Sequence, residues 1–145
     1  MTGLIACVVV LAVAGAFGML WKRRNGQMTA ARTSGDTLTA AEIGGPLGSQ
    51  ATLVQFSSAF CAPCRATRMI LNDVTSQLDG VTHVEIDAES HLDLVRKLDI
   101  RRTPTVLVLG PDGRIARRAS GRPTKSDVLA AAMSVMQNPA ASAGR

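Results

Sequence analysis

The sequence is poor in aromatic residues. Only 3% of its 145 residues are aromatic, with no tyrosine and a single tryptophan. Proteins that bind single-stranded nucleic acid combine basic residues with aromatic side chains that stack on the bases. The basic residues Arg114, Arg117, Arg118 and Arg122 cluster late in the chain, but no aromatic residues are interleaved with them. We therefore expect no nucleic acid partner. We interpret the cluster as a solvated edge, with a weak site for an acidic partner as the alternative.

Residues that bind transition metals are also scarce, since the chain has three cysteines and two histidines. A structural zinc site normally needs four ligands. Cys61 and Cys64 could supply two thiolates, but His83 and His91 lack the spacing of a zinc finger. No methionine or histidine cluster lies near the cysteine pair, which argues against delivery of a soft ion. We expect no metal, and a Cu(I) chaperone using Cys61 and Cys64 is a minor alternative.

Charge is distributed unevenly along the chain. The formal net charge is +5, of which residues 1–35, with four bases and no acids, contribute +4. Residues 36–145 contain twelve bases and eleven acids and contribute +1. Most of the excess lies in Lys22, Arg23 and Arg24, directly after a long uncharged segment. Bases in that position suit contact with anionic lipid headgroups.

Residues 3–21 form this uncharged, apolar segment. As a helix it would span about 28 Å, close to the hydrocarbon thickness of a bilayer. Basic residues tend to stay on the cytoplasmic side, so we expect a membrane anchor that contacts lipid, with its N-terminus outside and the following domain in the cytoplasm. Only Met1 and Thr2 precede the segment, without the basic region of a cleaved signal peptide. An extracytoplasmic domain is the alternative.

Composition divides the chain into four parts. Residues 1–24 comprise the anchor and its basic flank. The small and polar residues 25–37 predict a flexible linker, and residues 38–137 form one domain without internal repeats. Residues 138–145 predict a disordered tail.

Within residues 38–137, the hydrophobic patterns alternate between helix and strand. We expect helices after the capping box that Thr39 and Glu42 form, and at 64–78, 91–99 and 124–136. Strands are expected at 51–56, 82–87, 105–109 and 114–118, the last two joined by a tight turn. This order predicts an α/β fold with a mixed sheet and helices on both faces.

The cysteine pair lies between the strand at 51–56 and the helix at 64–78. A disulfide across three residues closes almost no loop, so it would contribute little stability. The free N–H groups and dipole of a helix N-terminus instead stabilise a thiolate, the form of cysteine that attacks disulfides. We therefore predict a redox centre in which Cys61 is the exposed nucleophile and Cys64 the resolving thiol.

Several motifs in this order resemble the thioredoxin family: "VQFSSAFCAPC", "VEID", "RRTPTVLVL", "PDGR", then a glycine and a final helix. The resemblance covers about residues 38–137 and implies a thioredoxin-like fold. It also implies that Pro104 is the cis-proline facing the cysteines and that Thr103 pairs its backbone with the substrate chain. Phe60, Ala62 and Pro63 would form the surface that contacts the substrate.

The sequence departs from the family pattern near the cysteines. Phe60 replaces the usual tryptophan and Ala62 the usual glycine. Gln55 replaces the buried acid that moves a proton to or from the resolving cysteine, and an amide does not accept that proton near neutral pH. His83 falls where the lysine partner of that acid lies. We hypothesise that His83, or water held by Gln55, relays the proton; a purely structural His83 is the alternative.

The resemblance implies a thiol–disulfide oxidoreductase. We expect it to reduce disulfide-containing protein substrates at the cytoplasmic membrane, recharged by a reductase or another dithiol protein. The redox-active Cys61–Cys64 disulfide would be its only cofactor. The first alternative is the same chemistry outside the cytoplasm. Another is a membrane scaffold in which the cysteine pair has no role.

Overall fold

The computed structural model describes residues 2–31 and 36–138. Its helices and strands are α1 (Thr2–Arg24), β1 (Thr29–Ala30), α2 (Ala40–Ile43), β2 (Ala51–Ser57), α3 (Ala62–Thr75), β3 (Val81–Asp87), α4 (Leu92–Lys97), β4 (Thr105–Leu109), β5 (Ile115–Ser120) and α5 (Lys125–Gln137). From α2 onward the order of elements is the one that the sequence predicts.

The strands form one mixed sheet in the order β1-β5-β4-β2-β3. β2 and β3 are parallel, whereas β4 pairs antiparallel with both β2 and β5. β2 is therefore a central strand, buried along its whole length. The sequence of a strand that is buried on both faces is a nearly continuous apolar run, which is the pattern seen at 51–56.

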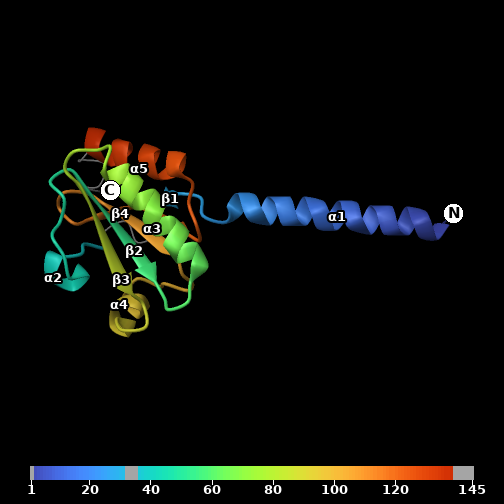
Figure 1. Cartoon of the computed structure of the whole chain (residues 1–145), viewed down its shortest axis with the longest axis horizontal. Coiled ribbons are helices and arrows are strands. Elements are labelled where there is room, and N and C mark those ends of the chain that lie inside the picture. The colour runs from blue at the N-terminus through green and yellow to red at the C-terminus, as the bar shows by residue number, and fades with distance from the viewer. Residues whose placement is uncertain (1, 32–35, 139–145) are drawn as a thin grey trace.

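Helices cover both faces of the sheet (Figure 1). On one face, α3 and α5 pack on a core that includes Leu53, Leu71, Val106 and Val128. On the other face, a second core joins the sheet to α2 and α4. Successive residues of a strand point to opposite faces. Gln55 lies two residues after Leu53, so its side chain points to the α3 face.

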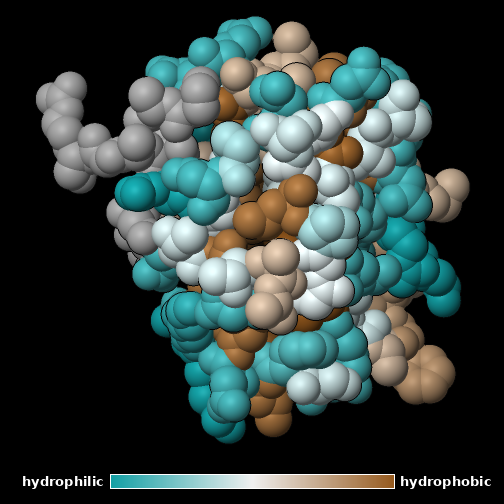
Figure 2. Space-filling model, turned by 90° about the vertical axis from the view of Figure 1, so that its left-hand side faces the viewer, coloured by the Kyte–Doolittle hydropathy of each residue, from teal (hydrophilic) through white to brown (hydrophobic). Residues whose placement is uncertain are grey.

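α1 projects away from the domain (Figure 1), and its hydrophobic side chains are exposed. Residues Gly3–Arg24 are long and apolar enough to cross a membrane, and a secretory signal meets the same criteria. The face of the domain that points away from α1 is mostly hydrophilic, with hydrophobic residues in smaller patches (Figure 2). α1 is therefore the part of the molecule suited to an apolar environment.

Part of the segment predicted as a flexible linker is ordered against the domain. Thr29 and Ala30 pair with β5, and Ala31 is buried. The Gly26 amide donates a hydrogen bond to the Ser120 carbonyl oxygen at 2.9 Å. The physical reason is that β5 has an open edge whose backbone groups take these partners. Residues 32–35 of the linker and 139–145 of the predicted tail lie outside the described residues.

The predicted helix start at residue 64 is two residues late. α3 begins at Ala62 because Cys61 is its N-cap, and Pro63 fits the first turn, where a missing N–H costs nothing. The capping box at α2 is present as predicted: Thr39 Oγ1 accepts from the Glu42 amide, and Glu42 accepts from the Thr39 amide. The cysteine pair is thus fixed at the start of a helix that follows a central strand.

Candidate active site

Cys61 and Cys64 form a disulfide at the N-terminus of α3, with an S–S distance of 2.04 Å. Cys61 is partly exposed, whereas Cys64 is only 2% exposed. The Cys64 amide also points at Cys61 Sγ, 3.2 Å away. This N–H of the first helical turn, which also donates to the Cys61 carbonyl oxygen at 3.1 Å, is thereby directed at the sulfur predicted to be the nucleophile, where it would stabilise a thiolate.

Phe60 directly precedes the disulfide and is fully exposed. Its backbone adopts φ 57°, an uncommon conformation for a bulky residue. This conformation turns the chain from β2 into α3 and leaves the aromatic ring in solvent beside Cys61. The position is consistent with the predicted substrate contact.

The loop before β4 lies beside the cysteine pair. The Thr103–Pro104 peptide bond is cis. The Thr103 hydroxyl lies 2.8 Å from the Ser58 hydroxyl, so this loop is linked to the one that carries the cysteines. A pocket of about 440 Å³ separates α3 from this loop. The predicted substrate-contact residues Ala62, Pro63, Thr103 and Pro104 all line it.

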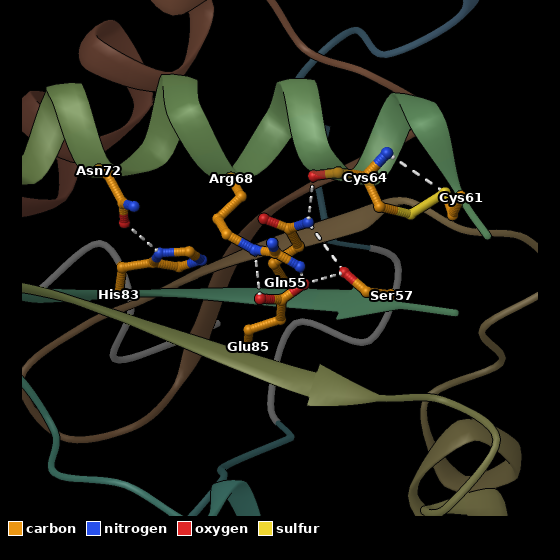
Figure 3. A network of polar contacts seen from close by, with 8 residues as sticks. All are labelled: Gln55, Ser57, Cys61, Cys64, Arg68, Asn72, His83 and Glu85. Atoms are coloured by element: carbon orange, nitrogen blue, oxygen red, sulfur yellow. Dashed lines mark hydrogen bonds and ion pairs between the residues drawn. A yellow bond between two sulfur atoms is a disulfide. The ribbon is translucent and has the colours of Figure 1, made fainter. Parts of the chain in front are cut away.

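Gln55 lies beneath Cys64 and is completely buried (Figure 3). Its Nε2 donates to the Cys64 carbonyl oxygen at 2.8 Å and to Ser57 Oγ at 2.9 Å. Its Oε1 is buried and has no hydrogen-bond partner among the described residues. The amide therefore holds the backbone of Cys64 in place and leaves one acceptor unused.

The contacts continue to an ion pair that sequence reasoning missed. Ser57 Oγ donates to Glu85 Oε1 at 2.6 Å. Arg68 donates to both oxygens of the same carboxylate, from Nε at 2.6 Å and from a terminal nitrogen at 2.7 Å. The hydrogen bonds from Arg68, supported by the one from Ser57, hold the pKa of Glu85 below its ordinary value. A carboxylate whose charged form is favoured thus lies two hydrogen bonds from Gln55.

Only the spacing of Cys64 and Arg68 along the helix signals this cluster in the sequence, and the strand register that completes it comes from the structure. Glu85 directly pairs with Gln55 in the parallel register of β3 and β2. Arg68 follows Cys64 by four residues, so both lie on one side of α3. The register and the helix position together bring the four residues to one place.

His83 lies further along the sheet, away from the cysteines (Figure 3). Its Nδ1 is 2.8 Å from Asn72 Oδ1, and no hydrogen bond joins it to Gln55 or to either cysteine among the described residues. Burial lowers its pKa, so the neutral ring is favoured. Its Nε2 is buried and has no hydrogen-bond partner among the described residues.

Residues 42–134 match the family model described as Thioredoxin. The chain belongs to the thioredoxin family. Among its relatives are Thioredoxin C-2 of Corynebacterium nephridii, 32% identical over 54% of this chain and 72% of that protein, and chloroplastic Thioredoxin Y2 of Arabidopsis thaliana, 37% identical over 48% of this chain. The match spans only 41% of the length of Thioredoxin Y2.

Solved thioredoxin structures share the fold. Chloroplastic thioredoxin z aligns with a TM-score of 0.56 at 25% identity, covering 61% of this chain and 80% of that one. Spinach chloroplast thioredoxin f aligns with a TM-score of 0.53 at 19% identity, covering 61% of this chain and 78% of that one. The thioredoxin-like fold predicted from the sequence is confirmed.

Within this thioredoxin domain, the disulfide is the group suited to redox chemistry. No group of three His, Cys, Asp or Glu side chains in the described ranges 2–31 and 36–138 is placed to hold a metal ion. Cys7 is the third cysteine, exposed on α1 and separate from the pair.

Proposed function

We propose that this chain is a thiol–disulfide oxidoreductase that reduces disulfides of protein substrates. The observation that carries the proposal is the Cys61–Cys64 disulfide at the N-terminus of α3, beside the pocket lined by Thr103 and Pro104. Membership of the thioredoxin family supports it.

The reaction exchanges one disulfide for another. The Cys61 thiolate attacks one sulfur of the substrate disulfide, forms a mixed disulfide and releases the other substrate sulfur as a thiolate. The Cys64 thiolate then attacks Cys61 Sγ, which restores the Cys61–Cys64 disulfide and releases the second substrate sulfur. Two electrons pass from the dithiol to the substrate, and no further cofactor is needed. The difference in exposure supports these roles, because substrate reaches Cys61 more easily than Cys64.

Water held by Gln55 is our candidate for proton exchange at Cys64. The buried Oε1 of Gln55 has no protein donor among the described residues, so it is an acceptor suited to hold such a water molecule. His83 is the weaker candidate, because its ring contacts Asn72 instead.

Trapping the mixed disulfide tests the reaction. The Cys64→Ser variant should accumulate a covalent adduct with a disulfide-containing substrate, because no resolving thiol remains. Cys61→Ser should form no adduct and lose turnover. Cys7→Ser is the matched control and should behave as the unaltered chain. Equal adduct formation by both active-site variants would refute the assigned roles.

The location and direction belong to the same proposal. We propose that α1 anchors the chain in the membrane, contacting lipid through residues 3–21, with the domain in the cytoplasm and a reductase or dithiol protein as electron donor. The bases Lys22, Arg23 and Arg24 support this orientation. Protease protection in sealed vesicles tests it, since a cytoplasmic domain is digested only from that side.

The midpoint potential of the pair tests the direction. It can be measured by thiol alkylation and mass shift after equilibration in redox buffers. A strongly reducing value supports a reductase, and a markedly oxidising value would overturn this direction in favour of an external exchange protein. For such a two-electron couple, about 30 mV corresponds to about 1.4 kcal/mol.

A further inference from the structure

The charged side chains that line the pocket beside the disulfide are all positive. Its lining includes Ala66 on α3, Pro104 on the opposite loop and the two arginines Arg102 and Arg122. None of the nine described residues that line it is acidic. A substrate chain that reaches Cys61 past Pro104 would therefore meet positive charge.

The two arginines are available to a partner. Both are exposed. Arg102 is oriented by one hydrogen bond to the Ser120 carbonyl oxygen, at 3.0 Å, and its other donors have no partner within residues 2–31 and 36–138. No ion pair or side-chain hydrogen bond occupies Arg122 among the described residues. Asp99, three residues before Arg102 in the chain, is bound by Arg101 at 3.0 and 3.1 Å and does not line the pocket.

The other side of α3 differs in charge. A second pocket, lined by Ser57, Ser58, Ala59, Arg68, Glu85 and Asp87, lies there. Residues two apart on a helix point in nearly opposite directions, so Ala66 and Arg68 place the two pockets on opposite sides of α3. In the second pocket Arg68 is neutralised by Glu85, and Asp87 adds a negative charge. The active site thus has a basic side and an acidic side.

We infer that the basic pocket selects disulfides whose flanking residues are acidic, through Arg102 and Arg122. This inference rests on the proposed function and names its class of substrate. Guanidinium groups bind carboxylates through paired hydrogen bonds, and a cleft of one charge raises the rate of encounter with oppositely charged partners. The acidic side would disfavour a long acidic segment that crosses both pockets, so the acidic residues should lie on one side of the substrate cysteine.

A single-turnover assay tests the inference with the full chain in a neutral detergent. The chain is reduced, freed of reductant and mixed with one of two dye-labelled peptides. Each peptide contains the same intramolecular disulfide, flanked on one side by three glutamates or by three lysines. We expect the glutamate peptide to be reduced about tenfold faster at an ionic strength of about 0.01 M, where the Debye length is about 30 Å. The preference should shrink at about 0.15 M, where that length is about 8 Å.

Charge-reversal variants identify the residues responsible. Arg122→Glu should lower the ratio of the two rates several-fold, and it removes no side-chain contact within the described structure. Arg102→Glu should act in the same direction. Arg96→Glu is the matched control, because Arg96 lies on α4 outside the pocket, in an exposed pair with Asp93. It should leave the ratio unchanged.

The outcomes separate this inference from the proposed function. Equal rates for the two peptides at low ionic strength, or an effect of Arg122→Glu no larger than that of Arg96→Glu, would overturn the acidic preference and leave the oxidoreductase intact. If the reduced chain transfers electrons to neither peptide, while dithiothreitol reduces both, the proposed function itself fails.

Discussion

Replacing Glu85 by Gln should destabilise the domain measurably, although Glu85 lies outside the hydrophobic core. Its carboxylate accepts three short hydrogen bonds, two from Arg68 and one from Ser57. A glutamine keeps one acceptor and turns an N–H₂ group toward the Arg68 donors. The Arg68 side chain is 45% exposed, so the ion pair itself contributes about 1 kcal/mol at most. The charge-assisted hydrogen bond from Ser57 contributes in addition. We therefore expect the free energy of unfolding to fall by about 1.5 kcal/mol.

The stability lost in the Glu85→Gln variant should depend on pH in a defined direction. Hydrogen bonds from Arg68, then from Ser57, lower the pKa of Glu85 from its ordinary value of 4.5. A carboxyl with a lowered pKa in the folded state contributes its stability above its unfolded pKa, and that contribution disappears as pH falls through the folded value. The difference between the unaltered chain and the Glu85→Gln variant should be constant at neutral pH and shrink below about 4.5.

Urea unfolding of the oxidised chain in detergent, followed by far-UV circular dichroism, measures this difference. Fluorescence is unsuitable because Trp21 lies on α1. Asp93→Asn is the control, since its pair with Arg96 is exposed, 3.4 Å long and of the i,i+3 type. It should cost below about 0.5 kcal/mol. The reasoning is wrong if Glu85→Gln costs no more than this control at neutral pH, or if its cost persists unchanged at strongly acidic pH.

Three further variants test other contacts. His83→Ala should leave the rate and pH profile of disulfide reduction unchanged, because the ring contacts Asn72; a changed profile would support a relay. Thr39→Ala should lower the free energy of unfolding by about 1 kcal/mol through loss of the N-cap, measured by the same urea unfolding. Gly26→Ala should release the segment before β1, detected as faster proteolysis there, because a Cβ would lie 1.9 Å from the Arg122 carbonyl oxygen; unchanged proteolysis would contradict the observed packing.

Local patterns predicted much of the fold. The apolar run of β2, the helical spacing in α3 and the turn before β5 depend on residues close in sequence, and each element is present, although α3 spans Ala62–Thr75 instead of the predicted 64–78. The position of the cysteine pair at a helix N-terminus was also predictable, because it depends only on the residues next to the pair. Pro104 was identified only through the family resemblance, and the structure places it in the pocket beside Pro63.

Contacts between segments that are distant in the chain were not predicted from the sequence. Glu85 reaches Ser57 across 28 residues and Arg68 across 17, and neither pairing leaves a periodic pattern. His83 was predicted as a relay residue because it occupies the position of the lysine that partners the family's buried acid. The neighbouring side chain on the same face of β3, two residues later, makes the contact instead, because the parallel register sets it against Gln55.

The pairing of Thr29 and Ala30 with β5 has a consequence for the solubility of the domain. β5 would otherwise be an outer strand of the sheet, with unpaired backbone N–H and C=O groups open to a strand of another molecule. The short segment after α1 occupies part of that edge and so prevents a strand of another molecule from pairing there. A soluble fragment that begins after residue 31 would lose this protection, and its tendency to aggregate would rise even though the disulfide and its pocket walls on α3 remain.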